Sequence, residues 1–325
     1  MSGADKVLIP IDTEREASVR IAIMGSGGVG GYFGARLVKG GADVHFIARG
    51  SQLEAIRKNG LKIESTLGDL HLKDAKATDD PARVGPVDVV LFAVKLWDTE
   101  KAAGQALSLV GPDTRVITLQ NGVDSVERLA PILGRDNVIG GIAYIATVIA
   151  APGVIRHTSP FARLRAGRID GTPDAMLARF VEAAQAAGID IKETNEINVD
   201  RWKKFVFLSS LAGATGSTRQ PLDAILADDD TRALLFNLLR EVIAVAHAKD
   251  VALPANFFDE QVAFAKSAQP GFKASMAHDL ERGNRLELDW LTGTVVKFGR
   301  ELGVPTPVSE AVYAVIKLHR MGAQK

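Results

Sequence analysis

"RIAIMGSGGVGGYFGARLVKGGADVHFIARGSQ", residues 20–52, decides the fold. A short apolar run precedes Gly25, Gly27 and Gly30, which are spaced as G-x-G-x-x-G. A helical stretch follows the glycines, and a second apolar run begins at Val44. This order of strand, glycine turn, helix and strand is typical of a dinucleotide-binding Rossmann unit.

Each glycine has its own task in such a loop. The first permits a tight turn, the second lets the backbone approach a pyrophosphate, and the third lets helix and strand pack closely. The N-terminus of the following helix faces the anion. A turn that only packs a helix against a strand is the alternative. The pattern predicts cofactor contacts at Gly25, Ser26, Gly27, Gly28, Val29 and Gly30.

Arg49 closes the second strand, 19 residues after Gly30 (49 − 30), where NAD-preferring sites usually carry an acid for the ribose hydroxyls. A guanidinium instead forms paired, charged hydrogen bonds with a 2′-phosphate. The pattern therefore predicts a preference for NADPH over NADH, with Ser51 and Gln52 as further candidate contacts. A solvated surface arginine is the alternative interpretation.

The composition is that of a soluble globular protein. The 325 residues are 46% hydrophobic and 24% charged, and 39 basic residues balance 39 acidic ones, so no overall field recruits nucleic acid or an anionic membrane. The absence of cysteine excludes disulfides and thiolate chemistry. No apolar run approaches the roughly 18 residues of a membrane span, and the N-terminus lacks a signal-peptide core. We expect a cytoplasmic protein with a small-molecule partner, and neither a nucleic-acid nor a membrane partner.

The histidines give no indication of a metal site, because no pair has ligand spacing beside an acid cluster. They are His45, His71, His157, His247, His278 and His319.

The chain divides into two halves. From Arg20 to about Phe161, β-branched runs alternate with helical stretches, which predicts a doubly wound parallel sheet. The runs are "RIAIMG", "DVHFIAR", "VDVVLFAV", "TRVITLQ" and "NVIGGIAYIATVIA"; "GVIRHTSPFARLRAG" follows as an expected pair of antiparallel strands, and "DAMLARFVEAAQAAG" as one more covering helix. Long helical segments follow at 199–213, 230–249, 256–267, 274–282, 287–302 and 307–321. We predict an α/β fold with a flexible leader (1–19), an NADPH-binding Rossmann-type domain (20–195) and an all-helical substrate domain (196–325).

Four further stretches occur in a recognisable order: "FAVKLWDT", "LQNGVD", "RWKKF" and "SMAHDLERGNRLELDWLTG". With the glycine-rich start, this set resembles the ketopantoate reductase family, which reduces 2-dehydropantoate to pantoate with NADPH in pantothenate biosynthesis. The resemblance covers nearly the whole chain from Arg20. It implies an active site in the cleft between the two domains, and a possible homodimer.

The resemblance assigns roles to three residues of the first three stretches. Lys95 matches a lysine near the cofactor phosphate and ribose, and Asn121 matches an asparagine that contacts the nicotinamide end and the substrate. Lys204 matches the general acid, which protonates the carbonyl oxygen as hydride arrives. Taken singly, these residues fit a surface lysine, a type I′ Asn-Gly turn and, with Lys203, a solvated lysine pair.

The last stretch supplies three more matches. Glu287 matches a glutamate that hydrogen-bonds the substrate and holds the proton of the catalytic lysine. Ser275 matches a serine that binds the substrate carboxylate, and Asp279 lies one turn further on the same helix face. A helix N-cap for Ser275 and a first-turn acid for Glu287 are the alternatives.

Two positions depart from the family pattern. Typical members carry asparagines four and eight residues after the catalytic lysine, where this chain has Leu208 and Ala212. The pocket should therefore favour a less hydroxylated 2-oxo acid, although Ser209 or Ser210 could compensate. Reduction of another carbonyl compound, alcohol oxidation in reverse, and a non-catalytic NADPH-binding sensor are the other hypotheses.

Overall fold

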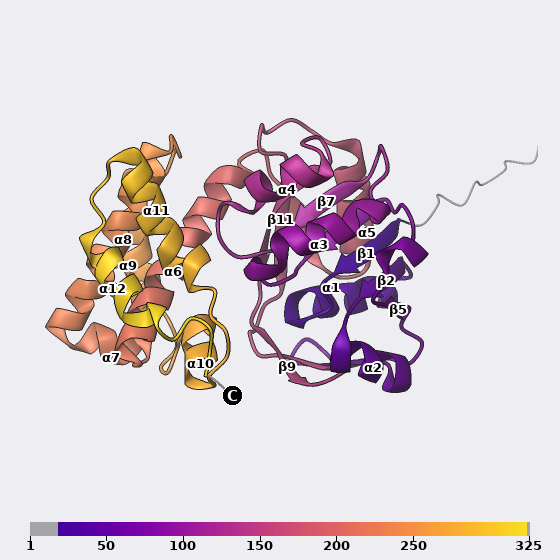
Figure 1. Ribbon diagram of the computed structural model, residues 1–325, viewed down its shortest axis with the longest axis horizontal. Helices are drawn as coiled ribbons and strands as arrows, with labels where there is room; N and C mark the ends of the chain where they lie inside the picture. The colour runs from indigo at the N-terminus through magenta and orange to yellow at the C-terminus, as the bar shows by residue number, and fades with distance from the viewer. Residues whose placement is uncertain (1–18, 324–325) are drawn as a thin grey trace, which may run out of the picture.

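The computed structural model describes residues 19–323. All of the predicted leader except Val19 lies outside the described residues, and Val19 is buried in the core. The chain forms an α/β body and a helical body side by side (Figure 1). Among residues 19–323, no helix is long and apolar enough to cross a membrane.

The α/β body is built on an eight-stranded sheet in the order β12-β11-β8-β7-β6-β1-β2-β5. All neighbours are parallel except β8 and β11, so the predicted doubly wound sheet is confirmed with one antiparallel pair. Strands such as β6 are buried along their whole length, because helices cover both faces. The strands are β1 (Arg20–Met24), β2 (Asp43–Ile47), β5 (Ala77–Thr78), β6 (Val89–Phe92), β7 (Arg115–Thr118), β8 (Val138–Tyr144), β11 (Arg163–Gly167) and β12 (Asp190–Glu193). The helices of this body are α1 (Gly28–Lys39), α2 (Gly50–Asn59), α3 (Thr99–Ala106), α4 (Ser125–Leu133) and α5 (Ala175–Ala186).

A second, four-stranded sheet was not anticipated from the sequence. Its order is β4-β3-β10-β9, formed by Leu70–Leu72, Leu61–Ser65, Val154–His157 and Thr147–Ala151. The single strand expected in "NVIGGIAYIATVIA" is wrong, since β8 and β9 lie in different sheets. The expected antiparallel pairing of β10 with β11 is also wrong, because β10 pairs with β3 and β9, and β11 with β8 and β12. Alternating apolar residues identify a strand but do not select its partner across a long loop.

The helical body confirms the all-helical second half. It contains α6 (Ile197–Thr218), α7 (Leu222–Ala227), α8 (Asp229–Ala248), α9 (Phe257–Lys266), α10 (Ser275–Glu281), α11 (Thr292–Leu302) and α12 (Pro307–Lys317). The short α7 was not predicted, and the expected helix 287–302 instead starts with a separate 3-10 turn, Leu288–Trp290. The last helix ends at Lys317, four residues earlier than expected (321 − 317).

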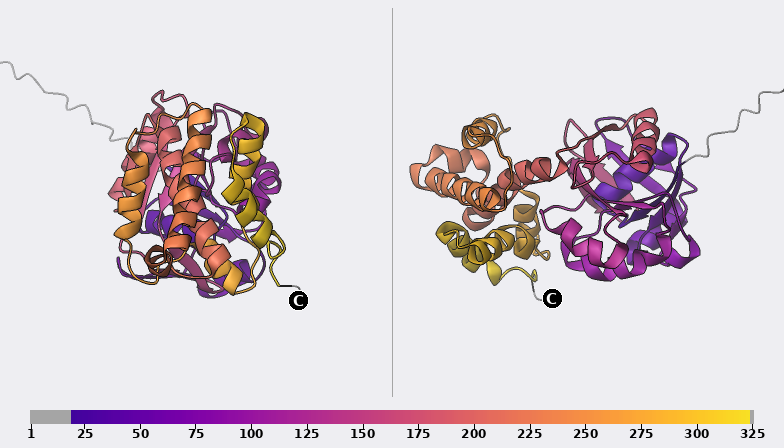
Figure 2. Two further views of the ribbon diagram at one scale, coloured as in Figure 1. Left: turned by 90° about the vertical axis from the view of Figure 1, so that its left-hand side faces the viewer. Right: turned by 90° about the horizontal axis from the view of Figure 1, so that it is seen from above.

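Helix α6 joins the two bodies (Figure 2). At its start, Ile197 packs against Gly140 of β8, and further along Gly213 lies against Leu238 of α8. One long helix therefore carries side chains from the Rossmann-type sheet into the helical core.

Candidate active site

The glycine loop has the shape that a dinucleotide requires. Gly25 has φ of +101°, a conformation that side chains disfavour, and a Cβ at Gly30 would lie 2.3 Å from the carbonyl oxygen of Gly25. A Cβ at Gly27, in contrast, would meet no protein atom within 4 Å. Gly27 is also the N-cap of α1, whose first turn contains no acid. Open space in front of free helix amides fits a pyrophosphate.

The neighbouring side chains hold this loop in place. Ser26 is buried and its hydroxyl donates to the carbonyl oxygen of Ile47 at 3.0 Å. Gln52 donates to the carbonyl oxygen of Ser26 at 3.1 Å and accepts from the backbone N–H of Gly153 at 2.9 Å. Gln52 thus ties the loop to the small sheet, whereas Ser51 is exposed.

Arg49 is the N-cap residue of α2, and its side chain is 73% exposed. Its guanidinium pairs with the carboxylate of Asp98, which belongs to the 3-10 turn Leu96–Asp98 after β6. Arg49, which is predicted to bind the 2′-phosphate, therefore lies next to Asp98. The sequence analysis did not single out this acid.

Lys204 of α6 reaches across to the Rossmann-type domain. Its Nζ donates to Oδ1 of Asn121 at 3.0 Å and to the carbonyl oxygen of Ala143 at 2.9 Å. Gly122 has φ of +88° and Asn121 does not have a positive φ, so the alternative of a type I′ turn is excluded. The neighbouring Lys203 instead lies near Asp200, 3.9 Å away on the same helix.

Burial lowers the pKa of Lys204 to about 8, and the nearby Glu287 carboxylate opposes this shift. The side chain keeps some exposure, at the wall of a pocket. The pocket is lined by Gln120, Asn121, Gly122, Gly141, Ile142, Arg201, Lys204, Phe205 and Leu208. A lysine in this state carries a proton near neutral pH and can release it.

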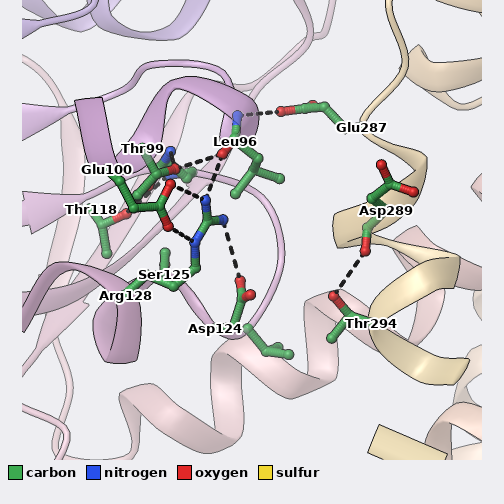
Figure 3. Close-up of polar contacts among 12 residues, drawn as sticks. Leu96, Thr99, Glu100, Thr118, Asp124, Ser125, Arg128, Glu287, Asp289 and Thr294 are labelled. Carbon is green, nitrogen blue, oxygen red and sulfur yellow. Dashed lines mark hydrogen bonds and ion pairs between the residues drawn. The ribbon is translucent and has the colours of Figure 1, made fainter. Parts of the chain in front are cut away.

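Glu287 joins the helical domain to the loop after β6 (Figure 3). Its buried carboxylate accepts from the backbone N–H of Leu96 at 3.2 Å, and Nζ of Lys95 lies 3.5 Å from its other oxygen. Lys95 also lies 3.5 Å from Asp279. Burial acts to lower the pKa of Lys95, but the two carboxylates outweigh it and raise that pKa. The structure thus brings Lys95, Asp279 and Glu287 together.

The remaining predicted substrate residues differ in their surroundings. Leu208 lines the pocket one turn after Lys204, whereas Ala212 is completely buried in the helical core. Ser275 is exposed, and its side chain makes no hydrogen bond within residues 19–323. The N-cap of α10 is Ala274, so the N-cap alternative for Ser275 is wrong.

Two residues of the pocket wall were not singled out from the sequence. Gln120 is buried and donates to the carbonyl oxygen of Val94 at 3.1 Å and to Oγ1 of Thr99 at 2.8 Å, which fixes the backbone next to Asn121. Arg201, also buried, donates to the carbonyl oxygen of Val123 at 2.8 Å and to Oγ of Ser125 at 3.2 Å. Its position one turn before Lys204 was the available signal.

Arg128 and Glu100 support the other side of the same loop. The guanidinium of Arg128 donates to both Glu100 oxygens, at 2.7 and 2.9 Å, and to the carbonyl oxygen of Leu96 at 2.8 Å (Figure 3). Leu96 is therefore held by Arg128 through its carbonyl and by Glu287 through its N–H. No cluster of three or more potential metal-ligating side chains occurs in the described part of the chain.

Comparisons with known proteins find matches to both halves of the chain. The family model described as Ketopantoate reductase PanE/ApbA matches residues 21–171, and its C-terminal counterpart matches residues 196–320. The 2-dehydropantoate 2-reductase of Mesorhizobium japonicum is 31% identical over 323 residues, which cover 92% of this chain and 97% of that protein.

Solved structures give the same result. The 2-dehydropantoate 2-reductase of Geobacter metallireducens GS-15 is 32% identical with a TM-score of 0.86, covering 92% of this chain and 99% of that one. The fold is also shared with a D-mandelate dehydrogenase solved with NADH and anilino(oxo)acetate, at a TM-score of 0.85 and 19% identity, covering 93% of this chain and 98% of that one.

Proposed function

The chain belongs to the ketopantoate reductase family of oxidoreductases, and we propose that it uses NADPH to reduce the ketone of a 2-oxo acid to a secondary alcohol. The observation that carries the proposal is the state of Lys204. This lysine has a pKa of about 8 and lies at the wall of a pocket between the two domains. It is thus both a cation and a proton source at neutral pH.

The hydrogen bonds of Lys204 leave one donor for a substrate. An ammonium group has three N–H donors. Asn121 and Ala143 accept two of them. We assign the third to the carbonyl oxygen of the substrate, where negative charge develops during reduction.

When bound, NADPH supplies the hydride that is added to the carbonyl carbon. Lys204 donates its proton to the carbonyl oxygen, so that C=O becomes CH–OH and the lysine becomes neutral. Asn121 orients the ammonium group through its Oδ1 atom. Glu287 keeps the lysine protonated before the reaction, because its negative charge raises the pKa of Lys204.

The glycine loop and Arg49 support the choice of cofactor. Gly27 leaves room for a pyrophosphate at the start of α1, and the Arg49 guanidinium, which is exposed and paired with Asp98, can form charged hydrogen bonds with a 2′-phosphate. Lys95 is proposed as a further cofactor contact. Ser275 is proposed as a contact to the substrate carboxylate, and Asp279 as a contact to another polar group of the substrate.

The substrate is the second part of the proposal. 2-Dehydropantoate is the family substrate, but a less hydroxylated 2-oxo acid is favoured by Leu208, which places an apolar side chain in the pocket wall one turn from Lys204. A buried hydroxyl without a partner costs about 1–3 kcal/mol.

The test is NADPH oxidation followed by absorbance, with 2-dehydropantoate beside a panel of apolar 2-oxo acids at equal concentrations. We expect turnover, with an apolar acid giving the highest specificity constant. The highest value for 2-dehydropantoate would remove the substrate shift and keep the reductase. Nucleotide binding without turnover of any 2-oxo acid would contradict the reductase and favour a sensor.

A further inference from the structure

We propose that Asp98 sets the cofactor preference, by competing with the 2′-phosphate for Arg49 and by offering its own carboxylate to a ribose hydroxyl. The inference rests on the proposed function, because it requires a nicotinamide dinucleotide on the glycine loop. Asp98 is a specificity-determining residue in this account. It makes the preference for NADPH over NADH smaller than Arg49 alone would give.

The position of the ion pair points to the adenosine half of the cofactor. Strand β1 leads into the glycine loop, and its two neighbours in the sheet are β2 and β6. Arg49 follows β2, and Asp98 follows β6 in the adjoining 3-10 turn. The two side chains therefore meet across the carboxyl end of β1. In Rossmann sites the ribose that carries the 2′ substituent lies at this edge.

The local structure argues against a purely structural role for Asp98. The residue occupies the N-cap position of α3, where an aspartate usually accepts a hydrogen bond from the first turn. Its side chain makes no such bond. Instead the carboxylate forms an ion pair with Arg49, the only ion pair of Asp98 among residues 19–323. The Asp98 side chain thus does not cap α3. It faces Arg49, the residue expected to bind the 2′-phosphate.

The exposures of the two side chains favour an exchange of partners. The Arg49 side chain is 73% exposed and that of Asp98 is 21% exposed. An ion pair with one partner so exposed is weakly held. A 2′-phosphate carries more charge than a carboxylate and can take the guanidinium. The displaced carboxylate then lies close to the phosphate and repels it.

The same carboxylate favours NADH. A ribose 2′-hydroxyl is a neutral donor, and Asp98 accepts it while remaining paired with Arg49. This is the role that an acid at the end of β2 plays in NAD-preferring sites. Here the acid follows β6, on the other side of β1 from β2, so the sequence position 19 residues after Gly30 does not reveal it.

The experiment measures dissociation constants of NADPH and NADH by nucleotide fluorescence, on the full chain and on Asp98→Asn. The amide keeps the shape and removes the charge. We expect NADPH to bind about threefold to tenfold more tightly and NADH no more tightly, so that the affinity ratio shifts toward NADPH by at least about threefold. Asp79→Asn is the matched control, because Asp79 forms an exposed ion pair with Arg57 of α2, 3.4 Å away. It should leave both constants unchanged.

Arg49→Gln separates this inference from the proposed function. Selective loss of NADPH affinity in Arg49→Gln, with no change of the ratio in Asp98→Asn, would overturn the role of Asp98 and keep the NADPH assignment. Equal effects of Arg49→Gln on both nucleotides would overturn the 2′-phosphate assignment, and with it the role of Asp98.

Discussion

Nζ of Lys204 lies 3.0 Å from Oδ1 of Asn121, which precedes it by 83 residues and belongs to the other domain. The contact spans the cleft beside the pocket. The amide oxygen of Asn121 accepts a hydrogen bond but carries no charge and does not take the proton. Asn121 therefore orients the ammonium group and leaves it charged. The proposed proton donor is therefore held in this position only when the two domains are together.

The lowered pKa of Lys204 predicts a specific pH dependence of the turnover rate. Burial lowers its pKa to about 8, so the protonated form needed for reduction disappears as the pH rises through that value. The turnover rate in the reductive direction should fall about tenfold per pH unit above 8, whereas the turnover rate of alcohol oxidation, which needs the neutral lysine, should rise toward pH 8 and level off above it. Steady-state rates between pH 6 and 10 test this. A flat reductive profile up to pH 10 would be incompatible with the assignment.

Replacement of Glu287 by glutamine should move that profile to lower pH. The carboxylate raises the pKa of Lys204, whereas an amide does not, yet glutamine still offers an oxygen to the N–H of Leu96. We expect the midpoint of the reductive limb to fall by about 0.5 to 1 unit. Asp43→Asn, remote at the start of β2, serves as the control. An unchanged midpoint in Glu287→Gln would remove Glu287 from control of the proton.

Leu208→Asn tests the origin of substrate choice. An amide in the pocket wall would give a hydroxylated substrate one hydrogen-bond partner, for roughly 0.5–1.5 kcal/mol. The preference for 2-dehydropantoate over an apolar 2-oxo acid, measured as the ratio of their specificity constants, should rise about threefold to tenfold. Leu208→Met is the matched control, because it keeps the volume without adding a polar group. Equal ratios in the two variants would mean that this wall does not select the substrate.

Gly27→Ala tests the phosphate loop. Since a Cβ there would meet no protein atom within 4 Å, the thermal unfolding temperature should stay the same, while NADPH binding should weaken by about tenfold or more. Gly104→Ala is the control: this glycine is exposed on α3 with equally open surroundings, and the substitution should stabilise the protein by about 0.5–1 kcal/mol without affecting NADPH. Unaltered NADPH affinity in Gly27→Ala would place the pyrophosphate elsewhere.

Local sequence was sufficient for the Rossmann-type unit because its signals are short-range. The spacing of Gly25, Gly27 and Gly30 between an apolar run and a helix indicated the turn directly. The small sheet gave no comparable signal. Its pairing of Ile63 with Ile155 joins strands whose partners are chosen by tertiary packing, and no pattern within either strand specifies that choice.

The site was predictable only as a set of residues. Sequence placed Lys204 and Asn121 in one cleft through the family resemblance, but the carbonyl of Ala143 is a backbone acceptor, which any residue would provide. The bond from the N–H of Leu96 to Glu287 joins residues 191 positions apart. Its donor is again a backbone group, which any residue except proline would provide. Burial decides the pKa of Lys204, and burial depends on the packing of both domains.

The proton-donor role of Lys204 is tested most directly by the single-turnover rate of NADPH oxidation in Lys204→Ala, with Lys204→Arg as a variant that keeps the charge but cannot release the proton. The account predicts that both variants lose about 100-fold or more in rate while NADPH affinity stays within about twofold of the wild type. A rate in Lys204→Ala close to that of the wild type would contradict it.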